Sequence, residues 1–158
     1  MSRPFAVVLW LALVALPGLA AAQDTIRVHV MAAGEDAGFT SKGADDSVAD
    51  LAKALGRKRR LMVVPSRSGA DVVIRVESRD SHWETGGAYS YRDSKGRTQV
   101  YSAIRKEKVV YATLHVEDYS HQLHGEGATW RQASDRVAND VDKWIQQNRR
   151  QLLERRER

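Results

Sequence analysis

The chain has 158 residues, a formal net charge of +5 and no cysteine. This length suits one domain with a single hydrophobic core, and the lack of cysteine excludes a disulfide scaffold, a thiolate metal site and a cysteine nucleophile. Much of the charge lies in the last ten residues, which hold five Arg against two Glu, and no stripe of alternating basic and aromatic residues is visible, so the composition argues against a nucleic-acid-binding protein.

The first 22 residues have the pattern of a secretory signal peptide. Arg3 precedes an apolar run from Phe5 to Leu16, and Ala20–Ala22 supplies the small residues of a cleavage site. We therefore expect an exported protein, periplasmic or extracellular, whose mature chain begins at Gln23. Because the apolar run is shorter than the roughly 20 residues of a membrane-spanning helix, we expect no membrane anchor after cleavage.

Several short strands and one short helix are expected in the following residues. Alternating or continuous apolar residues predict strands at Thr25–Met31, Leu61–Val64, Ala70–Glu77, Gln99–Arg105 and Val109–Asp118. A short amphipathic helix is expected over residues 45–56, because Val48, Leu51 and Leu55 share one face. The charged residues 105–108 are expected to form the tip of a hairpin that joins the last two strands.

A Gly-Glu-Gly break at residues 125–127 is expected to lead into a long closing helix. Thr129 and Gln132 fit a capping box at the start of this helix. Apolar residues recur at three- and four-residue spacing and form one stripe of helical period: Trp130, Ala133, Val137, Val141, Trp144 and Ile145. We expect this stripe to cover a sheet.

Together these elements predict an α+β fold. We expect a mostly antiparallel sheet of about five strands, with the short N-terminal helix and the long C-terminal helix on one face. Residues 23–148 are expected to form the single domain. Residues 149–158 are expected to form a basic helical tail outside the core, because this segment has few apolar residues beyond Leu152 and Leu153. The net charge of this tail favours weak, salt-sensitive contact with anionic surfaces.

Three segments carry a resemblance to known proteins. The runs Asp46–Leu51, Ala70–Ile74 and Gly125–Trp130 resemble a group of small exported bacterial proteins without assigned function. The β-α-β opening and the Ala-Asp-Val-Val strand are also similar, over residues 25–116 in outline, to the N-terminal domain of TolB and to CsgG-like envelope proteins. The resemblance implies a fold and an envelope setting, and it brings no catalytic motif and no functional residue with it.

The irregular stretch from residue 79 to 96 holds the first candidate site. His82, Trp83, Tyr89 and Tyr91 are candidates to line a ligand pocket, since aromatic rings supply contact area and imidazole supplies polarity. The alternative is an amphipathic hairpin that covers the open face of the sheet with half-buried rings.

The second candidate site is a polar cluster near the Gly-Glu-Gly break. His121, His124 and Glu126 offer imidazole and carboxylate groups, which are ligands for zinc, copper or nickel. On an extended strand His121 and His124 point to opposite faces, so a metal site there requires a tight turn. The alternative is an exposed strand end with ordinary polar residues, and no other cofactor is expected.

No motif in the sequence indicates an enzyme class. The chain has no Gly-x-Ser-x-Gly elbow, no His-Glu-x-x-His motif and no phosphate-binding loop. We therefore expect an exported, non-catalytic binding or envelope-accessory domain whose partner is an envelope protein or a small ligand. Two alternatives remain: a metal-binding protein or metal-dependent enzyme at His121, His124 and Glu126, and a cationic protein attached to anionic envelope polymers through its tail.

Overall fold

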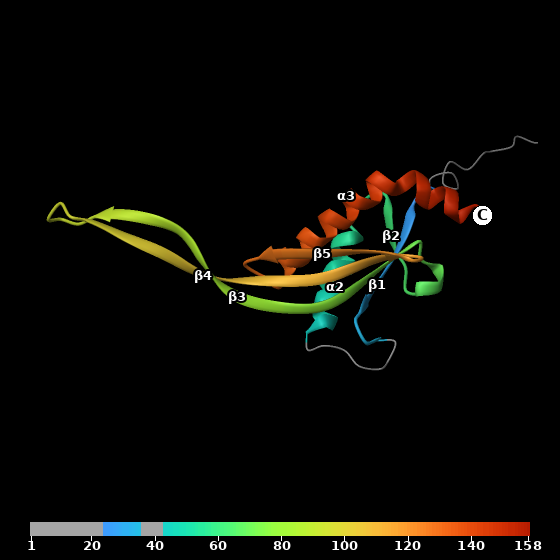
Figure 1. The fold of residues 1–158 in the computed structure, drawn as a ribbon, viewed down its shortest axis with the longest axis horizontal. Coiled ribbons are helices and arrows are strands. Elements are labelled where there is room, and N and C mark those ends of the chain that lie inside the picture. The colour runs from blue at the N-terminus through green and yellow to red at the C-terminus, as the bar shows by residue number, and fades with distance from the viewer. Residues whose placement is uncertain (1–23, 36–42) are drawn as a thin grey trace, which may run out of the picture.

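A computed structural model of the protein describes residues 24–35 and 43–158. The expected signal peptide, residues 1–22, and the expected mature start at Gln23 lie outside the described residues. The elements in chain order are β1 (Ile26–Ala32), α2 (Ala44–Leu55), β2 (Leu61–Val63), the short 3-10 helix η2 (Arg67–Gly69), β3 (Val72–Arg92), β4 (Thr98–Val116), β5 (Tyr119–Gly127) and α3 (Trp130–Arg156), as Figure 1 shows. This confirms the α+β class.

The strands form one five-stranded mixed sheet in the order β2-β1-β3-β4-β5. Strand β1 pairs in parallel with both β2 and β3, whereas β3-β4 and β4-β5 are antiparallel. The expectation of a mostly antiparallel sheet is therefore met only in part, since two of the four strand pairings are parallel. The cause is the helical crossover between β1 and β2, because two strands joined through a helix enter the sheet side by side and in the same direction.

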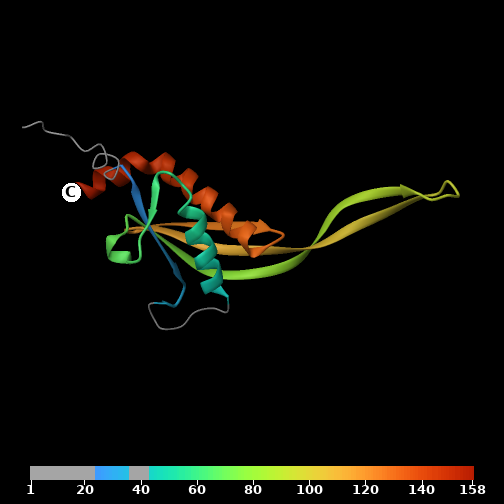
Figure 2. The ribbon, with the colours of Figure 1, turned by 180° about the vertical axis from the view of Figure 1, so that it is seen from behind.

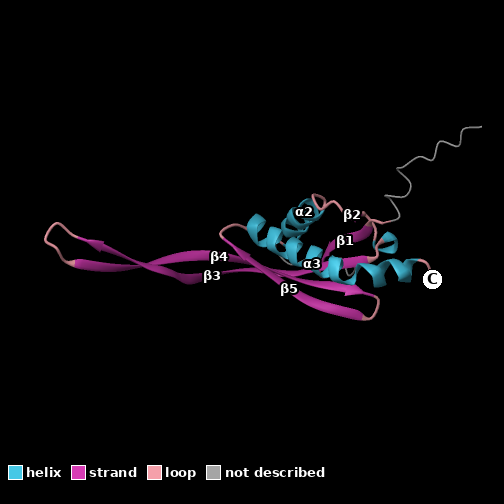
Figure 3. Cartoon of the chain, turned by 90° about the horizontal axis from the view of Figure 1, so that it is seen from above, coloured by secondary structure: helices cyan, strands magenta, loops and turns pink. Residues whose placement is uncertain are grey.

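Both helices cover the same face of the sheet. In Figure 2 they lie in front of the strands, and Figure 3 shows the helical layer on one side of the sheet. Helix α2 matches the helix expected over residues 45–56, but it follows β1, so the described chain opens with a strand. Alternate strand residues and one stripe of each helix form the core between the layers; its largest fully buried side chains include Ile26, Ile74, Val110, Leu114, Leu51, Leu55, Val137 and Ile145.

The turn of the long β3-β4 hairpin lies elsewhere than expected. Residues 105–108 do not form a hairpin tip, because β4 runs without a break from Thr98 to Val116 and these residues pair with residues 81–84 of β3. The turn is at residues 93–97, where the Asp93 amide donates to the Arg97 carbonyl over 2.9 Å and Gly96 adopts a φ of 74°. Charged residues are compatible with this part of β4 because most of its side chains face solvent.

Strand β5 was not expected from the sequence. It pairs antiparallel with β4 from Tyr119, opposite Val116, to Gly127, opposite Lys108. Its buried residues are Leu123, Gly125 and Gly127, so the core face of the strand carries one apolar side chain. Helix α3 packs directly on the two glycines, since a Cβ built on Gly125 would lie 2.1 Å from the carbonyl oxygen of Ala133.

The last ten residues are part of the folded body, which corrects the expectation that they lie outside the core. Helix α3 continues to Arg156, and Leu152 is 4% exposed and belongs to the core. Arg156 forms an ion pair with Asp71 and donates to the carbonyl oxygen of Thr25 over 2.8 Å. The end of α3 is therefore held against the sheet by an apolar contact and by charge-assisted hydrogen bonds.

Asp71 links three segments of this region and gives a pH-dependent prediction. Its side chain, 7% exposed, accepts from Arg27 over 2.8 Å and from Arg156. Burial acts to raise the pKa of Asp71, but the hydrogen bonds from the two guanidinium groups outweigh it and hold the pKa below the ordinary 3.8. Because the folded-state pKa is lowered, the stabilisation is present above pH 3.8 and is lost as the pH falls through the lowered value.

We expect Asp71→Asn to lower the free energy of unfolding at neutral pH by about 2 kcal/mol, since hydrogen bonds to charged groups contribute about that much. Urea unfolding at neutral pH and near pH 3 measures the effect. The difference between the two proteins should shrink at the lower pH, because below pH 3.8 the Asp71 carboxyl of the unfolded chain takes up a proton, which favours the unfolded state of the native sequence. A difference that is equal at both pH values would contradict this role of the Asp71 charge, and Asp118→Asn, on an exposed residue, is the control.

Candidate functional site

The β3-β4 hairpin continues far beyond the rest of the sheet. The last residue pair that β5 makes with β4 is Gly127 with Lys108, and the last pair of β1 with β3 is Ala32 with Val76. Beyond these pairs, within the described chain, β3 and β4 pair only with each other. We call residues 82–107 the arm. Figures 1 and 3 show it as a twisted two-stranded ribbon that leads away from the helices and the core.

The register of the arm assigns its side chains to two faces. Residues directly opposite each other on antiparallel strands point to the same side of the sheet. The even-numbered residues of β4 continue the row of Val110 and Ala112, which faces the helices, and the Lys108 Nζ atom accordingly lies 5.0 Å from the centroid of the Trp130 ring on α3. We call this side of the arm its helix-side face. It comprises Trp83, Thr85, Ala88, Ser90, Arg92, Thr98, Val100, Ser102, Ile104 and Lys106.

The opposite face of the arm has a different composition. The rings of Tyr89 and Tyr101, which pair across the strands, stack with their centroids 5.9 Å apart. The charged residues of this face lie nearer the body. The face comprises His82, Glu84, Tyr89, Tyr91, Gln99, Tyr101, Ala103, Arg105 and Glu107. The two faces therefore differ in both aromatic content and charge.

The most exposed large apolar side chains lie on the helix-side face. Trp83 is 69% exposed, and Val100 and Ile104 are each 67% exposed. None of the buried apolar residues found in the described part of the chain belongs to the arm. The apolar residues of the arm therefore do not contribute to the core, and a ribbon of two strands gains little stability by itself in water.

The structure places all four predicted ligand residues on β3 within the arm. His82, Tyr89 and Tyr91 lie on the opposite face and Trp83 on the helix-side face, so they do not line one pocket. The alternative expectation, a hairpin that covers the open face of the sheet, is wrong because the hairpin extends past the sheet. Val100 and Ile104 were not among the residues expected to bind a ligand. The sequence does hold a signal for them, because both are apolar residues of a strand segment with no core to cover.

The three predicted metal ligands lie on β5 and do not converge as a set. His121 is opposite Leu114, on the helix side, whereas His124 is opposite Tyr111, on the other side of the sheet. Glu126, two residues after His124, shares the side of His124. No tight turn brings the two imidazoles together, because β5 is continuous from Tyr119 to Gly127.

A different set of potential metal ligands meets at the base of the arm. The ligand atoms of His82, Glu84 and Glu107 all lie within 4.8 Å of one another, and Glu107 is only 6% exposed. The Arg105 Nη2 atom lies 2.5 Å from Glu107 and 3.8 Å from Glu84. Because this guanidinium already supplies the positive charge that the two carboxylates need, the cluster is best described as an ion-paired network at the base of the arm.

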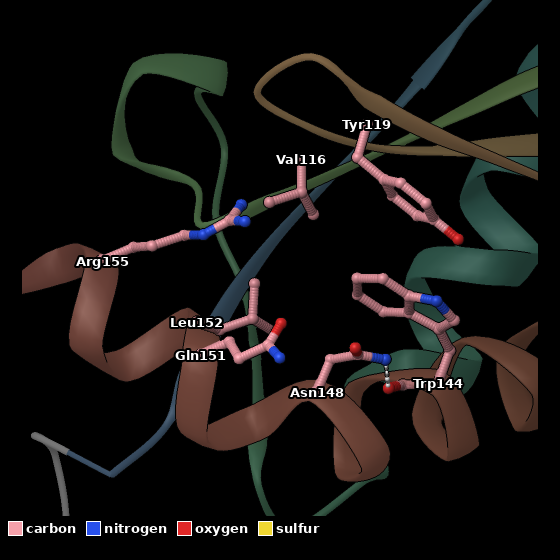
Figure 4. Close-up of a pocket in the computed structure, with 7 residues that line it drawn as sticks. All are labelled: Val116, Tyr119, Trp144, Asn148, Gln151, Leu152 and Arg155. Carbon is pink, nitrogen blue, oxygen red and sulfur yellow. Dashed lines mark hydrogen bonds between the residues drawn. The ribbon is translucent and has the colours of Figure 1, made fainter.

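A small pocket lies between α3 and the β4-β5 turn, as Figure 4 shows. Its volume is about 190 Å³, and the Tyr119 and Trp144 rings stack at its edge with centroids 5.6 Å apart. Pockets for small molecules usually measure about 300–1,000 Å³, so this one accommodates a fragment or a single side chain. Its lining residues are Val116, Tyr119, Trp144, Asn148, Gln151, Leu152 and Arg155.

A second cavity, of about 350 Å³, lies beside Asp71, Glu117 and Arg155. Its charged side chains are paired, since Asp71 is bound by Arg27 and Arg156 and the Arg155 Nη1 atom lies 3.3 Å from Glu117. His115 also lines it; burial and then the nearby Arg75 lower the pKa of His115, which favours the neutral ring. These pairs occupy the polar groups that a charged ligand would need, so we regard the arm as the stronger candidate site.

Comparison of the chain with models of known protein families and with curated proteins finds no match. The likeness to exported envelope proteins therefore remains a resemblance. No helix in the described residues has the length and apolar composition needed to cross a membrane.

Proposed function

We propose that this protein is an exported, non-catalytic binding module of the cell envelope and that the arm is its binding element. The observation that carries this proposal is the exposure of Trp83, Val100 and Ile104 on a ribbon that no other described element covers. Support for export comes from the signal-peptide pattern of residues 1–22.

The energetics of apolar burial support binding by the arm. Burying one such side chain against a partner contributes about 1.5–3 kcal/mol, and in the unbound protein this contribution is unused for the three residues. Tryptophan and tyrosine are also enriched among the residues that dominate binding energies. The arm carries Trp83 on the same face as Val100 and Ile104.

The body provides a rigid support for the arm. Strand β3 is the central strand of the sheet and β4 is its neighbour, so both strands of the arm begin inside the packed core. At the base, Lys108 and Arg79 lie over the Trp130 ring at 5.0 and 4.7 Å from its centroid. Such cation–π contacts stabilise a fixed direction of the ribbon where it leaves the body.

A protein with a shortened arm tests this function. We replace residues 82–107 with an Asn-Gly turn, which joins Ser81 to Lys108 and suits a two-residue hairpin loop. The free energy of unfolding is expected to change by less than about 1 kcal/mol, because the core lies outside the arm. Sedimentation of the purified protein with an envelope fraction is expected to be lost.

The matched control removes an exposed apolar side chain from the body. Met62 on β2 is 47% exposed, and Met62→Ser is expected to leave both stability and sedimentation unchanged. If the shortened protein folds and still sediments like the full chain, the arm is not the binding element and the proposal fails.

A further inference from the structure

The charges of the arm are divided unequally between its two faces. The helix-side face carries Arg92 and Lys106, and Lys108 follows at its base, whereas its described residues include no carboxylate. Both Glu84 and Glu107 lie on the opposite face. The charged side chains of the helix-side face are therefore all cationic, and they lie among apolar and hydroxyl side chains.

The cationic and apolar groups of this face are direct neighbours. Lys106 is opposite Trp83, with its Nζ atom 5.8 Å from the centroid of the indole ring. Ile104 lies two residues before Lys106 on the same side of β4, at the spacing of adjacent side chains on one strand face. An indole, a branched aliphatic chain and an ammonium group thus present one continuous surface to solvent.

This combination fits the headgroup region of an anionic membrane. Tryptophan favours the boundary between water and hydrocarbon, and a lysine buries its methylene chain there while its ammonium group reaches the phosphates. Basic residues at such a surface are attracted to anionic lipids, and the attraction adds to the burial of the apolar groups.

Other partners fit this face less well. A second copy docked through the same face would bring Arg92 and Lys106 against their like-charged equivalents, which is unfavourable. Single-stranded nucleic acid and carbohydrate are bound mainly by stacked rings, but three of the four arm rings, Tyr89, Tyr91 and Tyr101, lie on the opposite face.

Building on the proposed function, we infer that the partner of the helix-side face is a membrane surface that contains anionic phospholipids. The arm lies in the headgroup region and does not span the bilayer, because the outer edges of its two strands have backbone groups that hydrocarbon would leave unpaired. Trp83, Val100 and Ile104 enter the interface, and Lys106 and Arg92 contact lipid phosphates.

Co-sedimentation with lipid vesicles tests the inference on the mature chain, residues 23–158. Binding is expected to phosphatidylcholine vesicles that contain phosphatidylglycerol, to weaken in high salt, and to be much weaker with phosphatidylcholine alone. Lys106→Glu is expected to weaken binding about tenfold or more, since each basic residue near an anionic surface contributes roughly fivefold. Trp83→Ser is expected to weaken it by a similar factor.

Tyr91→Ser is the matched control, because Tyr91 is an exposed ring of the arm on the opposite face. It should leave vesicle binding unchanged. Equal effects of Trp83→Ser and Tyr91→Ser, or equal binding to both vesicle types, would overturn the inference. So would a dimer, detected by light scattering without vesicles, that Trp83→Ser dissociates.

The vesicle and envelope experiments separate the two proposals. If the protein sediments with the envelope fraction through its arm but binds neither vesicle type, the inference of a lipid partner fails and the proposed binding function stands. If the arm contributes to neither envelope sedimentation nor vesicle binding, both the proposed function and the inferred lipid partner fail.

Discussion

Deletion of residues 149–158 is expected to lower the free energy of unfolding by about 4 kcal/mol. Leu152 is 4% exposed in the core, and removal of a buried leucine side chain costs about 2–5 kcal/mol. The deletion also removes Arg156 from Asp71, which leaves a largely buried carboxylate with fewer partners at a cost of about 1–3 kcal/mol. Urea unfolding at neutral pH, monitored by circular dichroism, measures the loss.

Two point variants identify the source of this loss. Leu152→Ala is expected to cost about 2–3 kcal/mol, and Leu153→Ala, at a half-buried neighbouring position, less than half as much. Arg150→Ala is the charge control, because the Arg150 side chain is 91% exposed. If the deletion costs less than about 1 kcal/mol, the last ten residues are a separable tail after all and the packing of Leu152 is not stabilising.

Gly125→Ala is expected to cost about 3 kcal/mol, at the upper end of the usual range for an overpacked core. The added Cβ would lie 2.1 Å from the Ala133 carbonyl oxygen and 2.9 Å from Val137, so α3 must move away from β5. Thermal and urea unfolding measure the change.

Gly87→Ala, on β3 of the same sheet, provides the matched control. A Cβ on Gly87 would meet no atom within 4 Å, so the change is expected to alter stability by less than about 0.5 kcal/mol. Equal effects of the two substitutions would show that α3 does not pack on the backbone of β5. The pair therefore tests the contact between the last helix and the edge strand.

The helices could be predicted because their signal is local. The three- and four-residue spacing of Ala133, Val137, Val141 and Ile145 identifies the buried stripe of α3, and all four are buried. The cap was also predictable, since the Thr129 hydroxyl accepts from the Gln132 amide over 3.2 Å. Strand β1 could be predicted for the same reason, because its apolar and polar residues alternate along the chain.

The sheet arrangement could not be read from such patterns. Strand direction and order depend on which strands meet after the chain folds, so the parallel pairing of β1 with β3 has no local signal. Strand β5 was missed because Gly125 and Gly127 occupy its core-facing positions. Glycine has no apolar side chain to contribute to an alternating pattern, although its small size is what lets α3 approach.

The candidate site was predictable only in part. The sequence candidates His82, Trp83, Tyr89 and Tyr91 all lie in the arm that we propose as the binding element. The proximity of Trp83 to Lys106 and Ile104 depends on the register of β3 and β4, including the irregularity between Thr85 and Ala88. A one-residue error in register would exchange the two faces of the arm, and sequence alone does not fix that register.

A pair of site-specific spin labels tests the binding role of the arm most directly. The chain has no cysteine, so Ser102→Cys, on the helix-side face of the arm, and Ser120→Cys, exposed on β5, each give a single labelling site. On addition of the envelope fraction, the label at residue 102 is expected to lose mobility while the label at residue 120 keeps it. Unchanged mobility at residue 102, or a loss confined to residue 120, would contradict binding through the arm.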